Sequence, residues 1–126
     1  TVVREGVFYT ITNQRWFESN LPVPATQGNI FTSDTLTPGQ YIVVVTGAMT
    51  ATATTAVTLQ LKAAGFTLQE YEVQPNIASG AWSIPFAMNW AGALAAPGFP
   101  MLLEGFYSTG AAIIDNMTMT ATRTGP

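Results

Sequence analysis

The chain has 126 residues, a net charge of −3 and 48% hydrophobic residues, and it contains no histidine and no cysteine. This length and apolar content suit one domain, residues 1–126, with a core of its own. Without histidine or cysteine, Ser-His-Asp and Cys-His catalysis and thiolate or imidazole metal sites are unavailable. We therefore expect no enzymatic activity and no metal or other cofactor.

Charged residues make up only 9% of the chain, against roughly 25% in ordinary soluble domains. The four cations are scattered, so no basic stripe for nucleic acid can form. No apolar run approaches the roughly 20 residues needed to span a bilayer, so no membrane partner is expected. Threonine and alanine replace the missing charges, as in residues 118–124. Such a surface either contacts another protein or reflects the strand preference of threonine.

The first strong strand signal after the N-terminus lies in residues 7–12, where apolar and polar positions alternate. Residues 13–35 show no lasting period and include Pro22 and Pro24, which predicts an irregular N-terminal arm. Two accounts of Trp16 in this arm stay open. Its ring either fills one end of its own domain or packs on a neighbouring subunit.

Residues 36–49 are the stretch around which the rest is organised. Pro38 and Gly39 predict a turn with a positive φ at the glycine, and an apolar, β-branched run follows. Tyr41, Val43 and Val45 fall on one face of this run, and Ile42 and Val44 share the other with Ala48. Because both faces are apolar, we predict a central strand covered on both sides.

Two shorter strands are predicted next. Residues 56–62 alternate cleanly, with Leu59 and Leu61 directed inward. Residues 66–73 change phase partway along, which predicts a β-bulge or a strand that changes sheets.

Residues 82–90 show the most regular alternation in the chain, with Trp82 and Phe86 on the inward face. Pro85 cannot donate a hydrogen bond to a neighbouring strand, so this strand is predicted at a sheet edge or with a bulge. Residues 91–100 are apolar but rich in glycine, proline and alanine, and are predicted as a loop.

Two further strands, residues 101–108 and 113–123, complete a total of about eight, which predicts an all-β antiparallel sandwich of the jelly-roll type. Residues 1–35 would supply a first strand and the arm, and residues 36–123 the jelly-roll body. The predicted core consists of Tyr41, Val43, Val45, Leu59, Leu61, Trp82, Ile84, Phe86, Met117 and Met119.

The carboxylates offer little catalytic chemistry. Glu70 and Glu72 share one strand face, where neighbouring acids are usually solvated, and Glu104 stands among apolar residues. A glycosidase needs two carboxylates facing each other across a cleft. We expect Glu104 to point outward or to pair with an arginine.

Residues 36–123 resemble the tumour necrosis factor-like jelly rolls of bacteriophage virion proteins, in head decoration and fibre proteins. The resemblance lies in the Leu-x-Pro-Gly-x-Tyr opening at residues 36–41, the strand with Leu59 and Leu61, the strand beginning at Trp82 and the final strand at residues 116–123. It implies a non-enzymatic domain that forms a homotrimer and serves as capsid cement or fibre head.

The leading hypothesis is therefore a virion structural protein, made in the host cytoplasm, that binds the major capsid protein or another virion protein at the capsid surface. The alternative is a receptor- or carbohydrate-binding domain of a phage fibre or spike, with Trp16 beside Asn13 and Gln14 as the best glycan site. The residues predicted to contact a partner are the exposed or loop apolar residues and one cation: Arg15, Trp16, Phe17, Leu21, Leu94 and Phe99.

Overall fold

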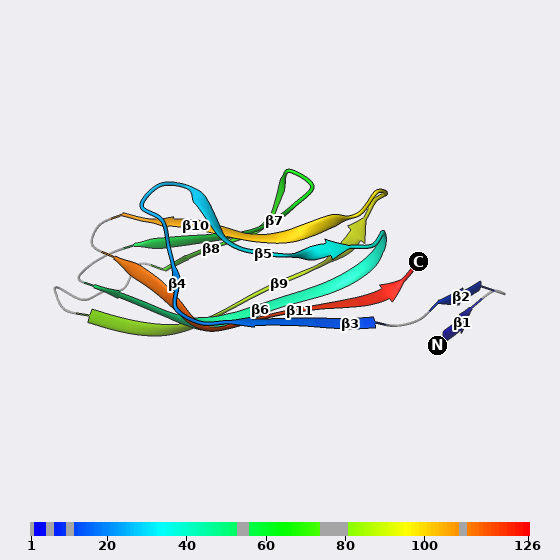
Figure 1. The fold of residues 1–126 in the computed structure, drawn as a ribbon, viewed down its shortest axis with the longest axis horizontal. Coiled ribbons are helices and arrows are strands. Elements are labelled where there is room, and N and C mark those ends of the chain that lie inside the picture. Colours follow the sequence, from blue (N-terminus) through cyan, green and yellow to red (C-terminus); the bar gives the residue numbers. More distant parts are fainter. Residues whose placement is uncertain (1, 5–6, 10–11, 53–55, 74–80, 109–110) are drawn as a thin grey trace.

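Two antiparallel β-sheets face each other in the computed structural model, which describes residues 2–4, 7–9, 12–52, 56–73, 81–108 and 111–126 (Figure 1). The strands are β1 (Val2–Arg4), β2 (Val7–Tyr9), β3 (Thr12–Glu18), β4 (Leu21–Pro22), β5 (Gly28–Leu36), β6 (Gly39–Thr52), β7 (Val57–Ala63), β8 (Phe66–Val73), β9 (Ala81–Leu94), β10 (Phe99–Tyr107) and β11 (Ala112–Gly125). One sheet has the order β5-β10-β7-β8 and the other β3-β11-β6-β9, with β4 also paired to β11. Apart from β3–β4 and the β7–β8 hairpin, successive strands from β3 to β11 pass between the two sheets. This confirms the predicted jelly-roll sandwich.

Strand β6 is central, as predicted, because it pairs with β11 on one side and β9 on the other. Gly39 has the expected positive φ, and a side chain there would collide with the Arg123 guanidinium. The prediction that both faces of this strand are covered is wrong. Val43 is fully buried, but Ile42 is 47% exposed and Val44 is 38% exposed. A sandwich of two layers has no third layer to cover the outward face.

The predicted irregular arm is also wrong, since residues 13–35 contain most of β3, β4 and most of β5. Strands β3 and β5 lie at sheet edges, each paired on one side only, with β11 and β10 respectively. Most β3 side chains are exposed, so no buried face imposes a period on the sequence. The prolines mark the crossing between the sheets: the Val23 amide donates to Ala112, and the Tyr107 amide donates to the Pro24 carbonyl.

The first predicted strand, residues 7–12, is divided in the structure. Residues 7–9 form β2, residue 12 begins β3, and residues 10 and 11 lie outside the described part. The phase change in residues 66–73 is confirmed as a bulge, because Leu61 pairs with Gln69 while Lys62 pairs with Thr67. This leaves Leu68 unpaired on the bulged strand.

The β9 strand lies at the edge of its sheet, as Pro85 predicted. The predicted loop over residues 91–100 is too long, because β9 continues to Leu94 and β10 begins at Phe99. Alanine and glycine have low strand propensity. Residues 91–94 are nevertheless extended, because their pairing with β6 continues in the same register from Ala91 opposite Ile42 onward.

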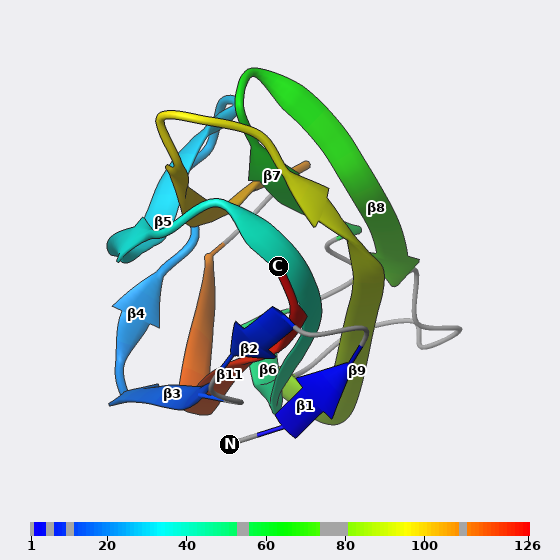
Figure 2. The same cartoon turned by 90° about the vertical axis from the view of Figure 1, so that its right-hand side faces the viewer.

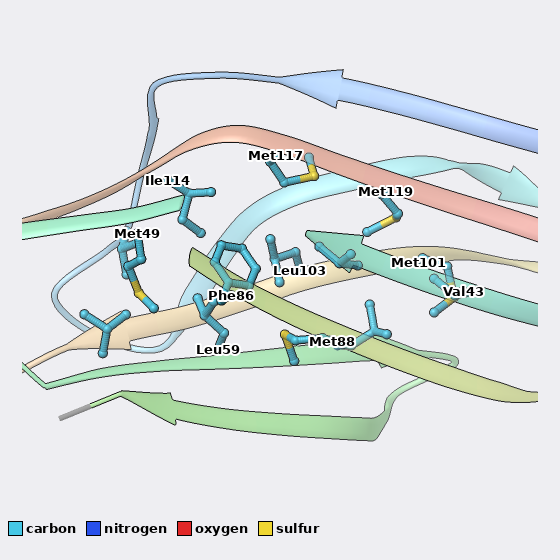
Figure 3. Close-up of a cluster of buried hydrophobic side chains, with 14 of the residues drawn as sticks. Val43, Met49, Leu59, Phe86, Met88, Met101, Leu103, Ile114, Met117 and Met119 are labelled. Atoms are coloured by element: carbon cyan, nitrogen blue, oxygen red, sulfur yellow. The ribbon is translucent and has the colours of Figure 1, made fainter. Parts of the chain in front are cut away.

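The core fills the space between the sheets (Figure 3). The predicted core residues all lie in it, although Ile84 is only partly buried. All five methionines are buried there: Met49, Met88, Met101, Met117 and Met119. Their unbranched, flexible side chains fill irregular gaps between the curved sheets.

The Gly105→Ala substitution is expected to lower the free energy of unfolding by about 1 to 3 kcal/mol. A β-carbon at Gly105 would collide with the Thr58 carbonyl oxygen and press on Leu59 of the neighbouring strand. Urea denaturation measures the change. Gly125→Ala is the control, because a β-carbon there makes only ordinary contacts with Gln40. Equal midpoints for the two variants would contradict the close packing.

Candidate interaction surface

The outward face of the β3-β11-β6-β9 sheet, here called the open face, is covered by no other strand of the described part of the chain (Figure 2). In the three rows that cross all four of these strands, strand pairing and alternation define its members. They are Asn13, Arg15, Phe17, Ile42, Val44, Thr46, Ala87, Asn89, Ala91, Thr118, Thr120 and Thr122. Arg15 is the one charged residue among these twelve, so this part of the face is nearly uncharged, and Phe17, Ile42 and Val44 are its exposed large apolar side chains.

Three rows of residues cross the open face. Phe17, which is 62% exposed, begins the row that ends at Ala87. In the middle row Val44 lies between Thr120 and Asn89. In the third row Ile42 lies between Thr122 and Ala91. The neighbours of Ile42 and Val44 are short, so no long polar side chain next to them in the rows can shield them from water.

The residues predicted to contact a partner are not on one surface. Arg15 and Phe17 are exposed on the open face. Leu21 is half-buried and packs against the core, and Leu94 is buried at the end of β9. Phe99 is half-buried at the start of β10.

The exposed pair Ile42 and Val44 was missing from the predicted contact residues. The signal was present in the sequence as the second apolar face of the run that now forms β6. It predicts a strand covered on both sides, because apolar residues on both faces of a strand usually indicate burial on both faces.

Trp16 lies on the inward side of β3, opposite Met119, and packs against the core as a partly buried side chain. Its indole Nε1 donates a long hydrogen bond of 3.4 Å to Asp34 Oδ2 on β5. The ring therefore spans the two sheets at their β3–β5 edge. Asn13 falls on the opposite side of β3, so these two residues do not form one glycan platform.

Trp16→Ala is expected to lower the melting temperature by several degrees, because it removes a large partly buried ring from the edge of the core. Trp16→Phe, which keeps much of the apolar area, should lose less. Thermal denaturation followed by circular dichroism measures both variants. Weakened assembly with an unchanged melting temperature would instead identify Trp16 as a contact to a partner.

The outward face of the other sheet is polar and internally hydrogen-bonded. Glu104 points outward, as expected, but its partner is Lys62 at 3.3 Å rather than an arginine. The Gln27 amide donates to Glu104 at 3.0 Å and to Gln60 at 2.8 Å, and the Gln60 amide donates to Glu70 at 2.8 Å. The two outward faces of the sandwich therefore differ in charge, because Lys62, Glu70 and Glu104 lie on this one.

Within the described ranges, no three acidic side chains lie close enough together to hold a metal ion. The same part of the chain contains no helix long and apolar enough to cross a membrane. All three tryptophans are described, and each is buried or half-buried.

No protein-family model and no curated protein sequence matches the chain. Among solved structures, the fold is similar to an Eiger TNF from S. frugiperda, with 12% identity and a TM-score of 0.47 over 90% of this chain and 85% of that chain. It is also similar to dimeric latent PorU from Porphyromonas gingivalis, with 17% identity and a TM-score of 0.48. That match covers 91% of this chain and 10% of the PorU chain. Likenesses at this level assign no family and no activity.

Proposed function

We propose that the chain is a virion structural protein that forms a homotrimer through the open face and decorates the surface of a phage capsid. The observation that carries the proposal is the exposure of Ile42 and Val44 in the middle of three rows in which Arg15 is the one charged residue. Exposed apolar side chains gathered on one face are typical of a surface that another protein covers. The likeness of residues 36–123 to phage virion jelly rolls supports the same class of protein.

A second copy of the chain suits the open face better than a partner of strong charge. Arg15 is the only charged residue in the three rows and lies on the edge strand β3, separated from Val44 by Thr120. Copies that meet through this face therefore bring few like charges together. Closed cyclic symmetry buries such a face on every copy, whereas an open arrangement leaves one face exposed at each end.

The polar face of the β5-β10-β7-β8 sheet would then point away from the trimer axis. Its side chains already satisfy one another, as in the Lys62–Glu104 pair and the contacts of Gln60. Such a face remains favourable in water. The ends of the sandwich would then contact the major capsid protein.

Capsid binding is tested by sedimenting the purified chain with empty tailed-phage capsids from which the decoration protein has been removed. Saturable co-sedimentation with the capsid at a fixed ratio to the capsid protein is the expected result. A glycan array is the parallel experiment. Binding to a defined glycan, without any binding to capsids, would favour the receptor-binding alternative.

A further inference from the structure

Strand β9 lies at the edge of its sheet, and its free edge is the side that faces away from β6. The pairing with β6 runs without a shift from Ala81 opposite Thr52 to Leu94 opposite Gly39. Within the described ranges, no other strand pairs with β9. A long edge strand presents a row of main-chain N–H and C=O groups with which a strand of another chain can pair. Strand addition is therefore expected at this edge unless something prevents it.

The main-chain N–H of Asn89 points away from β6 and is already occupied. It donates a hydrogen bond of 2.8 Å to the side-chain Oε1 of Gln69 on β8. Two positions further along β8, the ring centroid of Tyr71 lies 6.3 Å from that of Phe86 on β9. Figure 2 shows β8 and β9 next to each other at one side of the sandwich. A side-chain oxygen from one sheet thus binds an edge N–H of the other sheet, as the carbonyl of an added strand would.

Gln69 can reach β9 because it lies on the inner side of its own strand. It pairs with Leu61, which is fully buried, and residues directly opposite each other in an antiparallel pair project to the same face. The Gln69 side chain is half-buried. A polar group in such a place costs free energy unless it is hydrogen-bonded, and the Asn89 N–H supplies a partner for its oxygen.

Pro85 falls on the same free edge. Successive residues of a strand direct their N–H groups to opposite sides, and Pro85 lies four positions before Asn89 in an unbroken register. Proline has no N–H, so this edge lacks a donor at Pro85, and its donor at Asn89 is occupied. An added strand would find no donor for its own carbonyl groups at these two positions.

We propose that Gln69 and Pro85 together close the free edge of β9 to strand addition by another chain. The closure keeps copies of the protein from pairing edge to edge, which leads to aggregation. The proposal does not depend on the homotrimer, because it concerns main-chain groups at an edge and not side chains on the open face.

Hydrogen exchange of the Asn89 amide, followed by NMR, tests the part of Gln69. In Gln69→Leu the side chain keeps its apolar bulk but loses the acceptor, so this amide should exchange at least about tenfold faster than in the unsubstituted protein. Gln69→Glu retains an oxygen acceptor and should keep the amide protected. Equal exchange rates in Gln69→Leu and the unsubstituted protein would overturn the role of Gln69.

Strand addition itself is measured by light scattering of Gln69→Leu combined with Pro85→Val, which restores a donor at an exposed position. This double variant should associate at least about tenfold faster than the unsubstituted protein, and the amides of residues 87–93 should become protected in the associated material. Gln60→Leu is the matched control, because it adds the same side chain to β7, a strand paired on both sides. It should associate no faster than the unsubstituted protein.

Two outcomes would overturn the closure of the edge. One is a folded double variant that associates no faster than Gln60→Leu. The other is association that leaves the amides of residues 87–93 unprotected, because the copies would then join elsewhere. If circular dichroism shows that the double variant does not fold, Pro85→Val alone decides between the same outcomes, since its exposed side chain lies outside the core.

Discussion

Val44→Lys is expected to separate the proposed trimer into single copies that remain folded. Val44 lies in the middle row of the open face, between Thr120 and Asn89, and is already 38% exposed in one copy. A lysine there is solvated in the single copy. In the trimer it becomes a buried charge without a partner, which costs about 3 to 5 kcal/mol and weakens association at least about a hundredfold.

Sedimentation velocity at several concentrations measures this effect, and circular dichroism checks that the variant is folded. Phe66→Lys is the matched control, since it also replaces an exposed apolar side chain, 70% exposed, but on β8 of the other sheet. It should keep the mass of the unsubstituted protein. A Val44→Lys protein that sediments as the unsubstituted protein does would show that the open face is not the contact between copies.

Leu59→Ala is expected to lower the free energy of unfolding by about 2 to 5 kcal/mol. Leu59 is fully buried on β7, between Gly105 of β10 and Tyr71 of β8. The substitution removes apolar contacts and leaves a cavity between the two sheets, because the sheets cannot move together enough to fill it. Urea denaturation should be carried out in the Val44→Lys background, because association would otherwise add a concentration-dependent term to the stability.

Phe66→Ala in the same background is the control and should change stability by less than about 0.5 kcal/mol, because that ring is mostly exposed. If Leu59→Ala also changes the stability by less than that amount, Leu59 does not lie in the core.

The strands with one buried face could be predicted from the sequence. Strand β9 illustrates the reason. Trp82, Phe86 and Met88 lie four and two positions apart and are buried, while Ser83 and Ala87 between them are exposed. Burial on one face imposes a period of two on the sequence, and that period is visible without any structure.

The edge strands β3 and β5 could not be predicted in the same way. In β3, Gln14, Arg15 and Phe17 are all exposed, so main-chain pairing with β11 rather than burial holds the strand in place. Main-chain hydrogen bonds leave little trace in the choice of side chains. The pairing of Leu21 and Pro22 with β11 was hidden for the same reason.

The candidate site was predicted in part. Arg15 and Phe17 were proposed as contact residues and are exposed on the open face, but Trp16 between them faces the core side. For Ile42 and Val44, the apolar run predicts a strand face that is covered. Sequence shows that a strand face is apolar, but only the number of layers decides whether its own chain or a partner covers that face.

The mass of the unsubstituted full chain in solution tests the central claim most directly. Our account predicts that, at micromolar concentration, native mass spectrometry or sedimentation equilibrium will give three times the chain mass of 13.4 kDa. The open face would then be buried between copies. A mass of one chain up to the highest soluble concentration would contradict the claim that the open face joins copies of this protein.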